Sequence, residues 1–251
     1  MTTHSSLDLK LVIDILRRED SQCSLSWQKV KVHDIDARDF LCFAEQDLEE
    51  NSERGRVNSL SNAKRAIACR IDEILALMNF ERFAKHERWN LPYKMEVVES
   101  FGVPARNVLR DIITSKRNFL EHEYVRPERR EVRQIVDIAE LFLEATDKYI
   151  DRGRIRSARV GPNCVLDEDT LEILDGDTSK SKTRFWLCEK AELSFDFRTG
   201  SVKLALNLRH FDLEAKVVGE QERRENSLPL RDCEIEDVKE LMILLRKKGK
   251  A

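Results

Sequence analysis

The hydrophobic pattern of this chain changes period near Gly153, and this change limits the fold most strongly. Before Gly153, apolar residues recur at helical spacing over long segments; after it, shorter segments alternate apolar and polar residues. These patterns indicate helices and half-buried strands respectively. We therefore predict an α+β protein, with an N-terminal all-α helical bundle over residues 36–152 and a smaller α+β module over residues 153–251. Residues 1–35 are predicted to form an N-terminal extension.

Four or five amphipathic helices with short links are predicted in the first part, which is typical of an antiparallel bundle. Asp36 is a candidate N-cap for a helix that runs to about Glu50. A long helix is predicted from about Val57 to Phe80. Further helices are expected to open at prolines, which the first helical turn tolerates: Pro92, Pro104 and Pro127.

The two ends of the chain are less regular. Residues 7–16 fit either a strand or a helix, and we favour a helix followed by an extended segment. In the second part, strands are predicted at 184–190, 193–197 and 202–208, with hairpin residues at 198–200. Residues 175–182 and 220–227 are expected to be polar loops, and residues 235–246 a closing helix. The module is thus expected to hold an antiparallel hairpin or sheet and a C-terminal helix.

Composition excludes several classes of protein. The net charge of −3 rules out a surface that is basic overall, so any RNA contact must come from a local patch. The six cysteines form no CxxC pair, which argues against a zinc or redox motif and favours reduced thiols in the cytoplasm. The apolar stretch near the N-terminus is interrupted by charges and too short to span a bilayer, so no membrane association is predicted. No metal or cofactor is predicted.

The segment that carries chemistry lies late in the helix opened by Pro104. It holds Arg117, Asn118, His122 and Tyr124, with four residues between the Arg and the His. RNA cleavage without a metal needs a group that moves protons near neutral pH and a positive charge on the developing phosphorane. His122 suits the first task and Arg117 the second, because an arginine holds phosphate oxygens with two donors. Asn118 lies one helical turn before His122 and can orient it or the phosphate.

Arg117 and His122 do not share a face of a straight helix. Five residues apart, their side chains point about 140° away from each other. Either the helix ends or bends near His122, or an interface completes the site. A two-fold dimer would place two copies of each residue around one groove.

This segment resembles the signature of the HEPN superfamily, in which an Arg followed by a polar residue precedes a His. The resemblance covers about residues 36–150. It implies a helical bundle, a metal-independent endoribonuclease acting through the RNA 2′-hydroxyl, and a homodimer through the motif helix. Such proteins are commonly toxins or defence effectors, which implies an antitoxin or a nucleotidyltransferase as a candidate partner. In toxins paired with a nucleotidyltransferase, a Tyr placed like Tyr124 resembles the residue that is modified with AMP.

Each of these residues also has a structural alternative. Arg117 can form an ion pair with Glu121, His122 can stabilise a helix end, and Tyr124 can pack its ring. The alternative function is a non-catalytic HEPN module that binds RNA, a nucleotide or a protein partner, with the second part of the chain as its sensor. Four arginines that follow the motif are candidate RNA contacts or simply a solvated face: Arg126, Arg129, Arg130 and Arg133.

Overall fold

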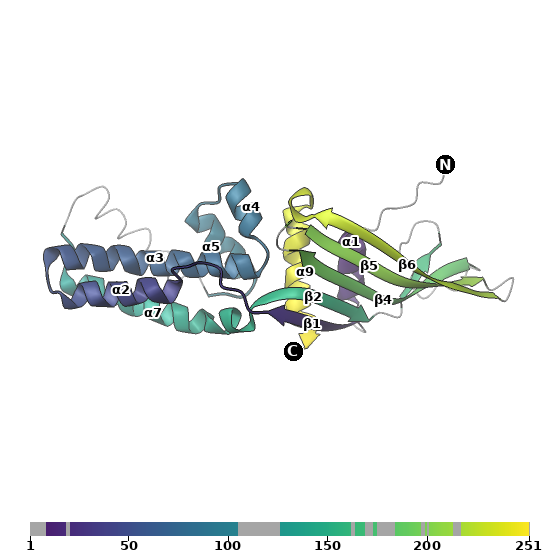
Figure 1. Ribbon diagram of the computed structural model, residues 1–251, viewed down its shortest axis with the longest axis horizontal. Coiled ribbons are helices and arrows are strands. Elements are labelled where there is room, and N and C mark those ends of the chain that lie inside the picture. The colour runs from purple at the N-terminus through teal and green to yellow at the C-terminus, as the bar shows by residue number, and fades with distance from the viewer. Residues whose placement is uncertain are drawn as a thin grey trace. The chain divides into compact units, whose positions relative to one another are not determined.

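The computed structural model describes residues 9–18, 21–104, 126–161, 164–168, 173–174, 184–196, 199, 201–212 and 217–250. The chain divides into two compact units. Residues 29–154 form the first, which we call the helical unit, and residues 1–28 and 155–251 form the second, which we call the sheet unit. Figure 1 shows the helices and strands of both units.

The predicted order, an all-α bundle first and a smaller α+β module second, is wrong. The chain begins with helix α1 (Leu9–Arg17) and strand β1 (Gln22–Gln28), and both belong to the sheet unit. The helical unit is inserted between β1 and β2 (Arg154–Gly161). The sheet is also large, with seven strands among the described residues. Residues 1–28 cannot bury the apolar face of α1 by themselves, so they join the core that residues 155–251 build.

The helical unit contains α2 (Ala37–Glu49), α3 (Glu53–Leu77), α4 (Glu81–His86), α5 (Leu91–Ser100) and α7 (Arg129–Arg152). The prediction of Asp36 as an N-cap is confirmed, since its carboxylate accepts from the backbone N–H groups of Arg38 and Asp39. Helix α3 begins earlier than predicted because Ser52 caps it, its hydroxyl accepting from Gly55 N–H at 2.8 Å.

A buried ion pair joins the three long helices of the helical unit. The guanidinium of Arg70 on α3 lies 3.4 Å from the Glu73 carboxylate and 3.2 Å from Asp147 on α7. Glu73 in turn accepts from the backbone N–H of Ala37, at the first turn of α2, at 3.0 Å. Burial raises the pKa of Glu73, an effect opposed by the Ala37 hydrogen bond and by Arg70. These contacts fix the start of α2 against α3 and α7.

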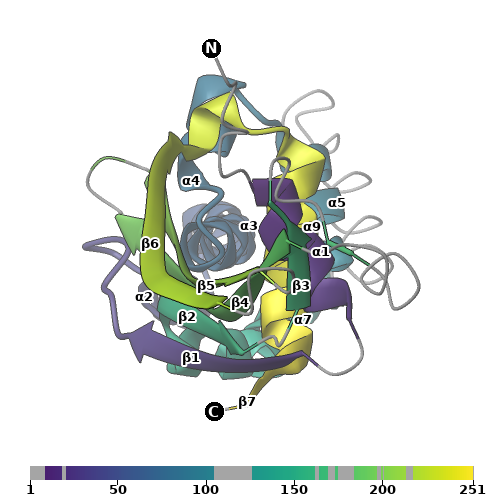
Figure 2. The ribbon, with the colours of Figure 1, turned by 90° about the vertical axis from the view of Figure 1, so that its right-hand side faces the viewer.

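The sheet unit is built on a twisted sheet with the strand order β6-β5-β4-β2-β1-β7, and β3 (Cys164–Asp167) pairs with β4. Strands β4 (Arg184–Asp196), β5 (Ser201–Asp212) and β6 (Val217–Pro229) form an antiparallel meander. A short 3-10 helix (Leu230–Asp232) leads to α9 (Ile235–Lys248), and β7 (Gly249–Lys250) runs parallel to β1. Helices α1 and α9 lie side by side against one face of the sheet (Figure 2).

The core of the sheet unit follows the period of two along the strands. Val202, Leu204, Leu206 and Leu208 of β5 are buried, whereas Lys203 between them is exposed. The predicted antiparallel hairpin is confirmed, because Asp196 pairs with Ser201. The two strands predicted at 184–190 and 193–197 form one strand with a bulge between Cys188 and Lys190. The polar loop predicted at 220–227 is wrong, since these residues belong to β6, and residues 175–182 lie outside the described part.

We predict that the sheet unit folds without the helical unit. β1 and β2 are neighbours in the sheet, and Gln22 lies beside Gly161. The last residue of β1, Gln28, and the start of β2 at Ile155 are therefore at the same end of the sheet. Replacing residues 29–154 by a short Gly/Ser linker should leave a protein with a β-rich circular dichroism spectrum and cooperative thermal unfolding, because closing a short loop costs little. A chain that is unfolded after this replacement would show that the division into two units is wrong.

We also predict that the two arginines bound to Asp147 differ in their effect on stability. The Arg70 side chain is 3% exposed and the Arg38 side chain is 46% exposed. Arg70→Met should lower the free energy of unfolding by about 3–5 kcal/mol, because it leaves the buried Glu73 without its cation. Arg38→Met is the matched control and should cost at most about 1 kcal/mol. Urea unfolding followed by circular dichroism measures both, and equal losses would contradict the assignment.

Candidate functional site

The motif residues Arg117, Asn118, His122 and Tyr124 fall within residues 105–125, outside the described part of the chain. The predicted dimer interface along the same helix lies outside it as well. The structure does describe the residues on both sides of this segment.

Contacts within the helical unit fix both flanks of residues 105–125. Before the segment, the carbonyl of Gly102 accepts from the Tyr149 hydroxyl, near the end of α7, at 2.9 Å. After it, the carbonyl of Pro127 accepts from Arg56 Nε, in the first turns of α3, at 3.1 Å. Arg154, just after α7, donates to the carbonyl of Ala76 near the end of α3 at 2.9 Å. Helices α3 and α7 therefore run parallel, and the two flanks are anchored at opposite ends of this pair.

A cavity of about 350 Å³ adjoins the second flank. It is lined by Arg126 and Pro127 together with five residues of α3: Glu53, Arg54, Arg56, Val57 and Asn58. Three of the lining residues are arginines (Arg54, Arg56 and Arg126) and one is acidic (Glu53), which leaves an excess of two positive charges. The cavity lies at the N-terminal end of α3, where the helix dipole also favours anions. This end of the helical unit has the charge to hold a phosphate group.

The four arginines predicted to contact RNA fall into two pairs. Arg126 forms an ion pair with Glu53 at 2.8 Å, and Arg129 donates to the Asn51 side chain at 2.7 Å. Arg130 and Arg133 are exposed on the first turns of α7, and among the described residues neither has an ion-pair or hydrogen-bond partner. The first pair fastens the flank of the motif to α3, and the second pair is available to a ligand.

A second, polar groove of about 490 Å³ lies between α2 and α3 and shares Asn58 with this cavity. Its wall combines amides with the ring of Phe43, which is 41% exposed. Asn62 donates to Asp47 at 2.8 Å, and Arg65 donates to Asn62 at 3.3 Å. The acidic side chains of this groove outnumber its single arginine, so it suits a neutral group better than a phosphate.

Sequence reasoning missed one polar cluster in the sheet unit. His210 on β5 lies 3.0 Å from the Glu168 carboxylate, and its ring contacts that of Trp186 with centroids 4.8 Å apart. The guanidinium of Arg224 on β6 lies over the same indole, 5.0 Å from its centroid. The alternation along β5 places His210 on the same face as Leu206 and Leu208, so a histidine at a buried-face position was the available signal. Its named members include no serine, threonine or cysteine that could act as a nucleophile beside His210. The cluster instead packs the end of β3 against the meander.

No family model, curated protein sequence or solved structure matches this chain.

None of the described helices is both long and apolar enough to cross a membrane.

Proposed function

We propose that the helical unit is a metal-independent endoribonuclease whose reacting groups are Arg117, Asn118 and His122. The observation that carries the proposal is the spacing of these three residues in one predicted helix. The arginine-lined cavity supports the proposal, because one of its lining residues, Arg126, directly follows the motif in the chain. The cavity can hold a phosphate that neighbours the one being cleaved.

The reaction that these groups suit is transfer of a phosphodiester to its own 2′-hydroxyl. A base removes the proton of the 2′-hydroxyl, and the oxygen attacks the adjacent phosphorus. The bond from phosphorus to the 5′-oxygen breaks, and an acid protonates that leaving oxygen. The products are a 2′,3′-cyclic phosphate and a 5′-hydroxyl. Arg117 would stabilise the charge on the phosphorane, and Asn118 would orient His122 or the phosphate.

The site is proposed to be completed in a homodimer through the motif helix. Arg117 and His122 diverge on a straight helix, so a second copy brings an Arg of one subunit near a His of the other. A role as a toxin or defence effector, with an antitoxin or a nucleotidyltransferase as partner, belongs to the same proposal. In that setting Tyr124 would be the residue that the partner modifies.

We predict that His122→Ala and Arg117→Ala each abolish RNA cleavage without lowering the melting temperature. Loss of the proton-transferring group should slow cleavage about 100- to 10,000-fold. Loss of the fixed charge should raise the barrier by about 3–4 kcal/mol. The assay follows a fluorescent RNA oligonucleotide, with EDTA present because no step needs a metal. His86→Ala on α4 and Arg156→Ala on β2 change exposed residues of the same types and should cleave like the wild type.

The outcomes separate the proposal from its alternatives. Cleavage that persists in both motif variants would assign the activity to another site or to a contaminant. A wild type that binds RNA through Arg117 but never cleaves it would favour a non-catalytic binding module.

We also predict that Arg130 and Arg133 contribute to RNA affinity. The double variant Arg130→Gln/Arg133→Gln should weaken RNA binding, and the slope of log Kd against log salt should fall by about one unit per lost phosphate contact. Arg129→Gln is the control, because its guanidinium already bonds to Asn51. Binding is measured by fluorescence anisotropy in the His122→Ala background. An unchanged salt slope in the double variant would show that this face of α7 is merely solvated.

A further inference from the structure

The sheet unit contains the largest cavity that we describe, with a volume of about 800 Å³. It is bordered by β1, the end of β2, Lys190 of β4 and the end of α9. Small-molecule sites in proteins typically measure about 300–1,000 Å³. The cavity is therefore large enough for a metabolite of the size of a nucleotide.

The charge of this cavity has one sign. Of the described residues that line it, four are lysine or arginine and none is aspartate or glutamate. The other lining residues include two serines and a glutamine, which supply hydrogen bonds, and Cys23 and Val160, which supply apolar surface. Such a lining favours an anionic ligand with an uncharged portion.

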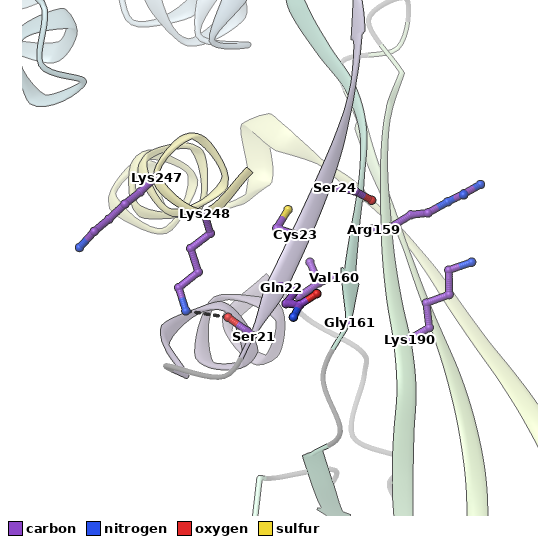
Figure 3. A pocket seen from close by; sticks show the side chains of 10 residues that line it. All are labelled: Ser21, Gln22, Cys23, Ser24, Arg159, Val160, Gly161, Lys190, Lys247 and Lys248. Atoms are coloured by element: carbon purple, nitrogen blue, oxygen red, sulfur yellow. Dashed lines mark hydrogen bonds between the residues drawn. The ribbon is translucent and has the colours of Figure 1, made fainter. Parts of the chain in front are cut away.

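Two of the four cations act together. Figure 3 shows Arg159 and Lys190 extending side by side on one side of β1, with the Ser24 hydroxyl directed to the same side (Figure 3). Lys248 instead turns to Ser21, whose hydroxyl accepts from its ammonium group at 2.7 Å, and Lys247 points away. The anion-binding position is therefore at Arg159 and Lys190.

The carboxylate of Glu192 bonds to both members of this pair. In the sheet register Glu192 is opposite Arg159, and its carboxylate lies 3.4 Å from that guanidinium and 2.6 Å from the Lys190 ammonium. A third cation, Arg223 of β6, lies 3.2 Å from the same carboxylate. The hydrogen bond from Lys190 lowers the pKa of Glu192, so the carboxylate stays ionised. Arg223 is bound more closely by Glu225, whose carboxylate lies 2.6 Å from its Nε, so the two lining cations and Glu192 leave an excess of one positive charge.

We propose that this cavity binds a phosphate-bearing small molecule, with its phosphate group between Arg159 and Lys190. The four cations that line the cavity, opposed by the one neighbouring carboxylate of Glu192, suit a phosphate monoester, which carries about −1.5 to −2 charges at neutral pH, better than a single carboxylate. Arg159 offers the planar pair of donors that phosphate oxygens accept, and Lys190 adds a point charge. Gly161, which also lines the cavity, leaves space for the rest of the ligand because it has no side chain. The site lies in the sheet unit and does not depend on RNA cleavage.

The experiment is isothermal titration of the full-length protein with AMP and ATP at low salt, with inorganic phosphate and a short RNA oligonucleotide as separate arms. We expect a nucleotide to bind in the micromolar range. Arg159→Ala and Lys190→Gln should each weaken binding tenfold or more, because each removes a charge-assisted contact. Lys203→Ala is the matched control, since Lys203 is exposed on β5 and paired with Glu225 but does not line the cavity.

Several results would overturn the proposal. Nucleotide binding that is equally strong in Arg159→Ala and in the wild type would place the ligand elsewhere. Binding of RNA alone, or no binding of any phosphate compound below millimolar concentration, would exclude a small-molecule site. The Arg159 side chain is 69% exposed, so Arg159→Ala should melt like the wild type and keeps the test valid if Lys190→Gln does not fold.

Discussion

The sheet unit depends on a core that the two ends of the chain build together. Strand β1 pairs in parallel with β7, the last strand, and helix α1 packs on α9. Arg17 of α1 holds the Glu240 carboxylate of α9 with two hydrogen bonds, each 2.8 Å long. These contacts form only when residues more than two hundred positions apart meet, so loop-closure entropy opposes them until the rest of the sheet exists. Two covalent links, one after β1 and one before β2, connect the helical unit to this core.

Inside the helical unit, Arg70 and Glu73 bring opposite charges into the core. Desolvation makes such a pair a weak source of stability compared with well-packed apolar residues. The pair instead fixes the positions of three helices, because Glu73 accepts from Ala37 N–H and Arg70 forms an ion pair with Asp147. The raised pKa of Glu73 means that the folded state holds a proton more tightly than the unfolded chain. This residue therefore favours folding as the pH falls toward its folded pKa and opposes folding as the pH rises through it.

The sequence predicts elements that are determined locally and fails where partners are distant. Capping residues and apolar spacing located α2, α5, α7 and α9, because those signals lie within the helices themselves. Strand β6 was missed because its run of charges from Glu222 to Glu225 shows no apolar alternation, and its pairing with β5 makes it a strand. The placement of α1 and β1 with residues 155–251 was missed because their partners, α9 and β7, lie far along the chain. In the candidate site, the motif was identified by residue type and spacing, whereas the division of the following arginines into bonded and available pairs required the contacts of Glu53 and Asn51.

The connections between the units decide how the two proposed sites can influence each other. β1 leads directly into the helical unit and β2 leads directly out of it, so these strands carry both covalent links. The phosphate site proposed in the sheet unit is bordered by the same two strands. A ligand there acts on the helical unit only if it binds one arrangement of β1 and β2 more tightly than another. In that case linkage is reciprocal, and RNA bound to the helical unit changes nucleotide affinity by the same factor that the nucleotide changes RNA affinity.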